Sequence, residues 1–296
     1  GKEGELWSPS NQLPDFSFAG YLCGNKEIPH IKATSTVSDF GAIPNSDQDM
    51  TQAFKDAIAA SSGGAISIPA GRYLLSDILW IKKSNLVLRG EGPGKTILEF
   101  TKDLEDIRPN MGKTTSGKST SNYSWSGGFI WLKGSYGEKF ISKINQESLR
   151  GPNKVSLDDS EKLVMGQYIT IELTEDNEKQ LIHELYSNDC GDITNFKRTT
   201  KAKFTSKILQ LNQQTIVLER PLPFDIKLKW KPIVKTFNPT LTHSGIENMT
   251  IAFPNSPYEG HFSERRKNAV AFNAVAHSWV TDVRFQNCDS GIFMNG

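Results

Sequence analysis

The stretch Gly63-Gly-Ala-Ile-Ser-Ile-Pro-Ala-Gly-Arg-Tyr73 decides the fold. It sets a short β-branched run between glycines and then turns at Pro-Ala-Gly, a pattern typical of a brief strand followed by a tight turn. Three more short apolar runs follow it, bounded mostly by Gly, Asn or Pro: Ile78-Leu-Trp-Ile81, Asn85-Leu-Val-Leu-Arg-Gly and Thr96-Ile-Leu-Glu-Phe100. The sequence therefore predicts a succession of short strands.

Upstream of this stretch the hydrophobic period is that of a helix. We predict a helix over residues 50–61, with Asp49 as its N-cap and Ser61-Ser-Gly-Gly64 at its end. Its apolar face carries Met50, Phe54, Ala57 and Ile58. Because only one amphipathic helix precedes the strands, the pattern argues against a doubly wound α/β fold.

Two strand patterns recur near the end of the chain. The segment 245–253 aligns with 278–286, so that Ile246 corresponds to Val280, 34 positions later. The segment 268–272 aligns with 290–294, 22 positions later. A spacing in the twenties is the length of one coil of a parallel β-solenoid, and the longer spacing fits a coil with an inserted loop.

Together these segments resemble a known superfamily. The run Val37-Ser-Asp-Phe-Gly-Ala, the Asp-rich turn after it, the predicted helix and the stretch 63–73 look like the opening of the pectate-lyase-like superfamily. The repeated strands resemble its middle turns, and the resemblance covers residues 36–100 and 240–296. It implies an all-β chain, folded as a right-handed parallel β-helix (solenoid) with an N-terminal capping helix and a long mid-chain insertion.

The expected domain organisation follows from where the resemblance holds. Residues 1–35 are rich in Pro, Gly and aromatic residues and are predicted to form an extended N-terminal arm. Residues 36–296 are predicted to form the parallel β-helix, with 101–240 as a long, β-rich insertion. A β-helix needs a cover at each end, so we expect its coils to continue in a C-terminal remainder of the same β-helix or in a neighbouring subunit.

Composition and charge exclude some classes of function. The net charge of +1 gives no global attraction to nucleic acid, and the absence of a long apolar run excludes a helical membrane span. Residues 158–192 carry ten acidic residues, whereas residues 193–235 carry ten Lys or Arg. These segments would either pair with each other or form a basic wall that holds an anionic chain.

The superfamily acts mostly on acidic polysaccharides, which implies a secreted or periplasmic lyase that cleaves a uronate or sulfated polysaccharide by β-elimination. Such a reaction needs a group that neutralises the carboxylate, a base for the adjacent proton, and an acid for the departing oxygen. The anionic polysaccharide is the expected partner, and nucleic acid is not.

The densest group of titratable side chains lies in the loop 258–267. We expect His261 as the base, Tyr258 as the acid and Arg265 as the group that neutralises the carboxylate. Glu264 would orient His261 or, with Glu259, hold Ca²⁺, the only cofactor suggested; no metal ligand is assigned. The residues expected to bind substrate are Arg266, Lys267, Glu259, Asp282 and Asp289. A solvated, charge-rich turn is the alternative interpretation of this loop.

Two other functions remain open. A glycoside hydrolase on the same fold would need two close carboxylates, for which Asp282 and Asp289 are the first candidates. A non-catalytic, glycan-binding tailspike or adhesin would need neither. Sugar-stacking platforms would come from among the six tryptophans, Trp7, Trp80, Trp125, Trp131, Trp230 and Trp279.

Overall fold

A computed structural model describes residues 7–11, 13, 15–109, 112–113, 117, 119–120, 123, 126–176, 178–257 and 266–295. The chain divides into two compact units. The parallel unit consists of Glu27–Tyr136 and Pro239–Gly296, and the antiparallel unit consists of Gly1–Lys26 and Gly137–Asn238. In chain order the long segment of the antiparallel unit therefore lies between the two segments of the parallel unit.

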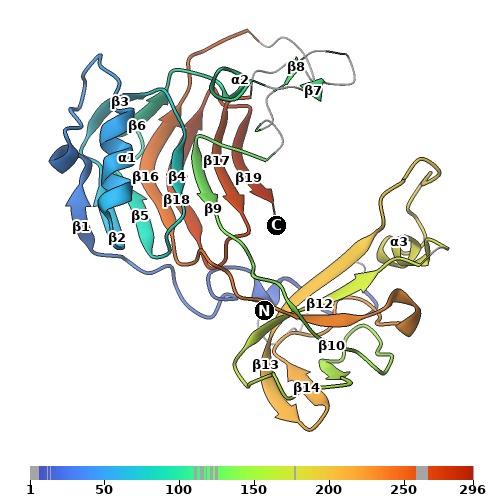
Figure 1. The fold of residues 1–296 in the computed structure, drawn as a ribbon. Coiled ribbons are helices and arrows are strands. Elements are labelled where there is room, and N and C mark those ends of the chain that lie inside the picture. Colours follow the sequence, from blue (N-terminus) through green and yellow to red (C-terminus); the bar gives the residue numbers. More distant parts are fainter. Residues whose placement is uncertain are drawn as a thin grey trace. The chain divides into compact units, whose positions relative to one another are not determined.

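The parallel unit contains two sheets whose strands all run parallel, and the predicted β-rich class is confirmed (Figure 1). The strands of the larger sheet are β1 (Ala33–Thr36), β2 (Gly64–Ser67), β3 (Gly71–Leu75), β5 (Leu86–Arg89), β6 (Thr96–Phe100), β16 (Gly245–Ala252) and β18 (Trp279–Gln286). The smaller sheet has the order β19 (Ser290–Asn295), β17 (Asn268–Asn273), β9 (Ile130–Lys133) and β4 (Leu79–Ile81). Successive turns of the chain thus add strands to both sheets. The remaining elements are η2 (Val37–Phe40), α1 (Thr51–Ala60), α2 (Leu104–Ile107) and the two-stranded pair β7 (Gly112–Lys113) and β8 (Ser119–Thr120).

The long strands of the larger sheet bend in the middle, where a single residue is left-handed. In β16, the residues before Asn248 pair with β5 and those after it pair with β6. Asn248 has φ 56°, and Asp282 has φ 50° at the equivalent place in β18. Asn and Asp tolerate this conformation better than most residues, which explains why a side-chain amide and a carboxylate occupy the two bends.

The predicted repeats are confirmed by the strand register. Ile246 pairs with Val280, and Asn268 pairs with Ser290. The strand β9 pairs with β4 and β17 in the smaller parallel sheet, although the sequence had placed these residues in the long insertion. Its apolar residues Ile130 and Leu132 are fully buried in the core of the parallel unit, so this strand forms part of a coil.

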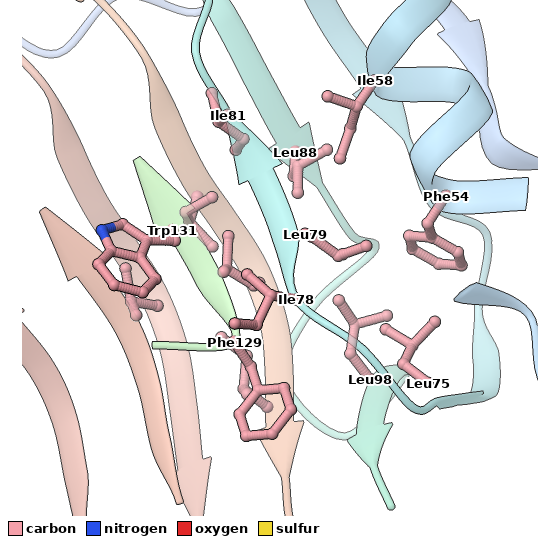
Figure 2. Packing of buried hydrophobic residues seen from close by; sticks show 14 of the residues in the cluster. Phe54, Ile58, Leu75, Ile78, Leu79, Ile81, Leu88, Leu98, Phe129 and Trp131 are labelled. Atoms are coloured by element: carbon pink, nitrogen blue, oxygen red, sulfur yellow. The ribbon is translucent and has the colours of Figure 1, made fainter. Parts of the chain in front are cut away.

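Helix α1 packs on the core of the parallel unit through the apolar face that the sequence predicted (Figure 2). Phe54 is 0% exposed and meets the Tyr73 ring edge-on, with centroids 5.4 Å apart. The N-cap is Met50, one residue after the predicted Asp49, which still accepts a hydrogen bond from the Thr51 amide at 2.8 Å.

Replacing Phe54 by Leu should lower the free energy of unfolding by roughly 1–2 kcal/mol, because the edge-on ring contact is lost and a small cavity remains. Urea unfolding followed by fluorescence measures this change. The control is Gln52→Ala on the exposed face of α1, which should stay within about 0.5 kcal/mol of the wild type. Equal stability of the two variants would show that α1 is not packed as described.

The antiparallel unit is a six-stranded sheet of the order β10 (Phe140–Lys143), β15 (Ile233–Thr236), β12 (Tyr168–Thr174), β13 (Lys201–Asn212), β14 (Thr215–Leu218) and β11 (Lys154–Ser156). It also contains η1 (Phe16–Phe18), α3 (Gln180–Leu185) and η3 (Leu228–Trp230), and it has its own apolar core. The N-terminal segment belongs to this unit through the Arg150 side chain, which lies over the Trp7 ring and donates to the Leu13 carbonyl at 2.8 Å.

Candidate functional site

The loop predicted to carry the chemistry connects β16 to β17. Five of its candidates, Tyr258, Glu259, His261, Glu264 and Arg265, lie outside the described residues. The described residues on either side of them, 254–257 and 266–267, show where the loop leaves the sheets and returns to them.

Lys267 closes the base of this loop. Its ammonium group donates to the Pro254 carbonyl and to the Ser256 hydroxyl, each at 2.7 Å. Its backbone amide donates to the Asp289 carboxylate, also at 2.7 Å. The two predicted substrate-binding residues Lys267 and Asp289 are thus in contact, and each helps to fix the loop to the next coil.

Arg266 connects this loop to the preceding coil. Its carbonyl accepts a hydrogen bond from the Leu104 amide at 3.1 Å, at the start of α2. Helix α2 belongs to the long connection between β6 and β9, which joins the same two sheets one coil earlier. Two long loops therefore meet at the edge between the larger and the smaller sheet.

Asp282 and Asp289 lie at opposite ends of residues 283–286, which run as an extended strand. Asp282 occupies the bend of β18, and Asp289 sits in the turn that leads to β19. Six residues separate them, and the four extended ones, 283–286, alone span roughly 13 Å of backbone, beyond the separation of about 5–10 Å between the carboxyl groups of glycosidases. The pair therefore gives little support to a hydrolase centre.

A row of aromatic side chains lies beside these loops on the smaller sheet. Trp80 of β4 stacks on Trp131 of β9, with ring centroids 4.5 Å apart and planes 22° apart. Tyr123, from the loop between α2 and β9, meets the Trp131 ring edge-on at 4.8 Å. Trp131 is 2% exposed and donates its indole N–H to the Asn273 side chain, whereas Trp80 is half-buried. Figure 2 shows the Trp131 side chain on the opposite side of β9 from Leu79 and Phe54.

Two lysine side chains lie beside the rings of the aromatic row. The Lys82 ammonium lies 5.3 Å from the centroid of the Trp80 ring, and the Lys133 ammonium lies 5.3 Å from that of Trp131. Within the described part of the chain neither lysine has a carboxylate partner. Aromatic faces beside unpaired ammonium groups are suited to sugar rings that carry an acidic group.

A column of turn residues stacks on the opposite side of the smaller sheet, where it joins the larger one. Asn85, His243 and His277 are all left-handed and occupy equivalent places in three coils. The two imidazole rings lie 5.4 Å apart and are nearly parallel, at 22°. Burial and, second, the neighbouring His243 lower the pKa of His277.

This lowered pKa predicts a pH dependence of stability. The unfolded chain binds the His277 proton more readily than the folded protein, so the stabilising contribution is present above the ordinary pKa of about 6.5 and is lost as the pH falls. We expect the Tm to fall between about pH 7 and pH 5, and to fall less in His277→Asn, since Asn accepts the left-handed backbone. Parallel thermal melts of the two proteins that show the same pH dependence would contradict this assignment.

The acidic and basic segments of the antiparallel unit pair with each other. Buried Glu172 accepts from Lys235 at 2.7 Å and from Lys201 at 2.9 Å, and Lys203 accompanies Glu138 at 2.9 Å. Burial alone would raise the pKa of Glu172, but its two lysine partners outweigh burial and hold that pKa below the ordinary value. Internal pairing is thus seen for part of the basic segment: among the described residues Lys201, Lys203, Lys207, Lys227 and Lys235 have carboxylate partners, of which Glu172 and Glu184 belong to the acidic segment.

Among the described residues, no three His, Cys, Asp or Glu side chains come together as a metal site. No helix in the same residues is long and apolar enough to cross a bilayer. Glu259 and Glu264, the residues suggested for Ca²⁺, are outside the described part.

Comparison with known proteins identifies the family that the fold resembles. Residues 34–146 match the model of a family described as rhamnogalacturonase A/epimerase, pectate lyase-like. The resemblance to the pectate-lyase-like superfamily is confirmed. The tailspike protein gp49 of Pseudomonas phage LKA1 shares the fold, with a TM-score of 0.54 and 14% identity over 88% of this chain and 40% of that one.

Curated relatives match only a part of this chain. Mannuronan C5-epimerase AlgE1 of Azotobacter vinelandii is 30% identical over 121 residues, which is 38% of this chain and 9% of the relative. Alginate lyase 7 of the same organism is 30% identical over 96 residues, 29% of this chain and 11% of the relative. The chain spans less than a fifth of the length of the curated relatives it matches.

The tryptophans were candidates from the sequence, but the row that two of them form was not predicted. A signal for this row was present, because β4 has the sequence Leu-Trp-Ile and β9 has Ile-Trp-Leu. A bulky ring at the centre of two matching apolar triplets places both rings on the same face once the strands pair in register.

Proposed function

We propose that this protein acts on a uronate polysaccharide and cleaves it by β-elimination. The reaction removes the proton at C5 of the uronate, next to the carboxylate, and expels the oxygen at C4. The C5–H bond breaks, a C4–C5 double bond forms, and the glycosidic oxygen leaves with the electron pair of the C4–O bond. A sulfated, uronate-containing polymer would undergo the same step.

The loop 258–267 would supply the groups for this step. His261 takes the C5 proton, Arg265 neutralises the carboxylate so that this proton becomes acidic, and Tyr258 protonates the leaving oxygen. Glu264 orients His261, and Arg266 with Glu259 contacts neighbouring sugars. An imidazole suits the role of base because its ordinary pKa lies close to neutral pH.

The observation that carries the proposal is the meeting of two long loops at one edge of the parallel unit. Lys267 and Asp289 fix the base of the first loop, and the Arg266 carbonyl connects it to α2 of the second. Loops held by such contacts, next to a row of aromatic rings, are suited to position catalytic groups against a sugar chain. The relatives named for mannuronan and alginate support a uronate polymer, because both polymers consist of uronate sugars.

Those relatives also favour a second candidate, C5 epimerisation. It begins with the same proton removal, but a proton then returns to C5 from the opposite face and the C4–O bond stays intact. A glycoside hydrolase and a non-catalytic tailspike or adhesin remain weaker alternatives. We further propose that α1 caps the first coil of a right-handed β-helix, and that the antiparallel unit is the elaboration inserted between two of its coils.

A direct test incubates the protein with polymannuronate, polygalacturonate, glycosaminoglycans, ulvan and fucoidan, with and without EDTA. Ultraviolet absorbance follows unsaturated uronate ends, and a second assay follows reducing ends. We expect both signals to rise together with at least one uronate polymer. Reducing ends without absorbance would show hydrolysis and overturn the lyase assignment. Loss of both signals with EDTA would show that a divalent cation is required, and recovery on adding Ca²⁺ would identify it.

A further inference from the structure

A hollow in the parallel unit lies between α1 and the first strand of the smaller sheet. It has a volume of about 350 Å³ and is lined by Lys55, Ile58, Ala59, Trp80, Lys82 and Lys83. Trp131 stacks on the Trp80 indole, and Trp80, but not Trp131, lines the hollow. Ile58 and Ala59 of α1 form the apolar wall on the other side.

The charged side chains that line the hollow are all lysines, and they differ in what they contact. Lys55 forms an ion pair with Asp77, and Lys83 donates to the carbonyls of Ala59 and Ser61 at the end of α1, at 2.6 and 3.0 Å. Lys82 is exposed, and its ammonium lies over the face of the Trp80 ring. Two lysines are thus held in place, and the third is available in the described part of the chain to pair with an anion.

We propose that this hollow is a binding subsite for a uronate sugar, separate from the loop 258–267. The sugar ring would lie against Trp80 and the apolar wall of α1, and its carboxylate would pair with Lys82. The choice of a uronate, rather than another anionic ring, rests on the proposed function. The subsite would hold a distant part of the polymer while the loop acts on another part.

The physical properties of the hollow match this class of ligand. Its volume is at the lower end of the range of about 300–1,000 Å³ for ligand pockets, which suits one or two sugar rings. The face of an aromatic ring offers apolar contact area but no hydrogen-bond donor. An ammonium group offers a positive charge that can pair with an anion from several directions. Together they select an anionic sugar over a neutral one.

The test measures binding by isothermal titration calorimetry with trimers of mannuronate and of galacturonate, a sulfated trisaccharide and neutral maltotriose. All variants carry His261→Ala, so that turnover does not consume the ligand. Lys82→Gln should raise the Kd for a uronate trimer about fivefold at low salt, and Trp80→Leu should raise it about tenfold. The matched control is Lys95→Gln, another exposed lysine of the parallel unit, which should leave the Kd unchanged.

The inference is overturned if Lys82→Gln and Lys95→Gln bind a uronate trimer equally well. Maltotriose binding as tightly as the uronate trimers would overturn it too, and binding of the sulfated trimer alone would overturn the choice of a carboxylate. Lys82 is exposed, so this variant keeps the test valid even where Trp80→Leu fails to fold. If binding depends on Lys82 but the wild-type protein transforms no uronate polymer, the subsite is supported and the proposed function is refuted. If the wild-type protein transforms a uronate polymer but binding does not depend on Lys82, the proposed function is supported and the subsite is refuted.

Discussion

The variant His261→Ala is expected to lower the initial rate of unsaturated-end formation by about 10²–10⁴-fold, the usual contribution of a positioned general base. The physical reason is that the C5 proton is only weakly acidic, and water is too weak a base to remove it at a useful rate. The KM should change little, because the imidazole contacts the proton mainly in the transition state. Initial rates on the best polymer of the panel, measured by ultraviolet absorbance, give both quantities.

A second histidine provides the control for this experiment. His243→Asn alters a left-handed turn residue that Asn tolerates, and it should leave the rate within about twofold of the wild type. If His261→Ala retains the wild-type rate, another residue is the base. In that case Tyr258 and Glu264 would be the next substitutions, since a phenolate and a carboxylate can also accept a proton.

The largest effect on stability is expected at Arg89, which joins the two segments of the parallel unit. Its guanidinium meets Glu247 at 2.5 Å, and Glu247 also accepts from the Trp279 indole N–H at 2.7 Å. The two charged side chains are only 13% and 7% exposed. Arg89→Met would leave the Glu247 carboxylate buried without its counter-charge, and should lower the free energy of unfolding by about 3–5 kcal/mol.

Two further variants distinguish the loss of this buried ion pair from the loss of an arginine side chain in general. Arg89→Met with Glu247→Gln should recover most of the loss, because a neutral amide still accepts from Trp279 and needs no counter-charge. Arg72→Met is the matched control: it breaks an ion pair with Glu99 on the same sheet, but Arg72 is 41% exposed, so the loss should stay below about 1 kcal/mol. Chemical unfolding of all three variants measures these changes. Equal losses of unfolding free energy for Arg89→Met and Arg72→Met would refute the role assigned to the buried ion pair.

The sequence predicts the coils best where two of them follow each other closely. Ile246 and Val280 could be aligned because β16 and β18 are consecutive turns, and each keeps its apolar residues at the same positions. The pairing of β5 with β16 could not be predicted from the sequence, because the segment Gly137–Asn238 of the antiparallel unit lies between Val87 and its partner Gly245. The apolar pattern within a short segment indicates that it forms a strand. Which distant strand it pairs with is determined only by tertiary packing.

The same distinction applies to the candidate site. Lys267 and Asp289 were named as separate substrate-binding residues, and their contact arises only because two coils stack. The hollow at Trp80 also depends on distant elements, since Ile58 comes from α1 and Lys82 from the end of β4. The charge pattern of the sequence allowed either pairing within the unit or an anion-binding wall. The burial of Glu172 among lysines could not be predicted, because these residues come together only when the antiparallel sheet forms.

The most direct test of the central claim is exchange of the C5 proton of a uronate polymer in D₂O, followed by NMR. Both elimination and epimerisation begin with removal of this proton, so the experiment tests the step that they share. We predict that the wild-type protein replaces or removes the C5 proton of polymannuronate or polygalacturonate, and that His261→Ala does so far more slowly. An unchanged C5–H signal with every uronate polymer of the panel, after long incubation with folded wild-type protein, would contradict the account.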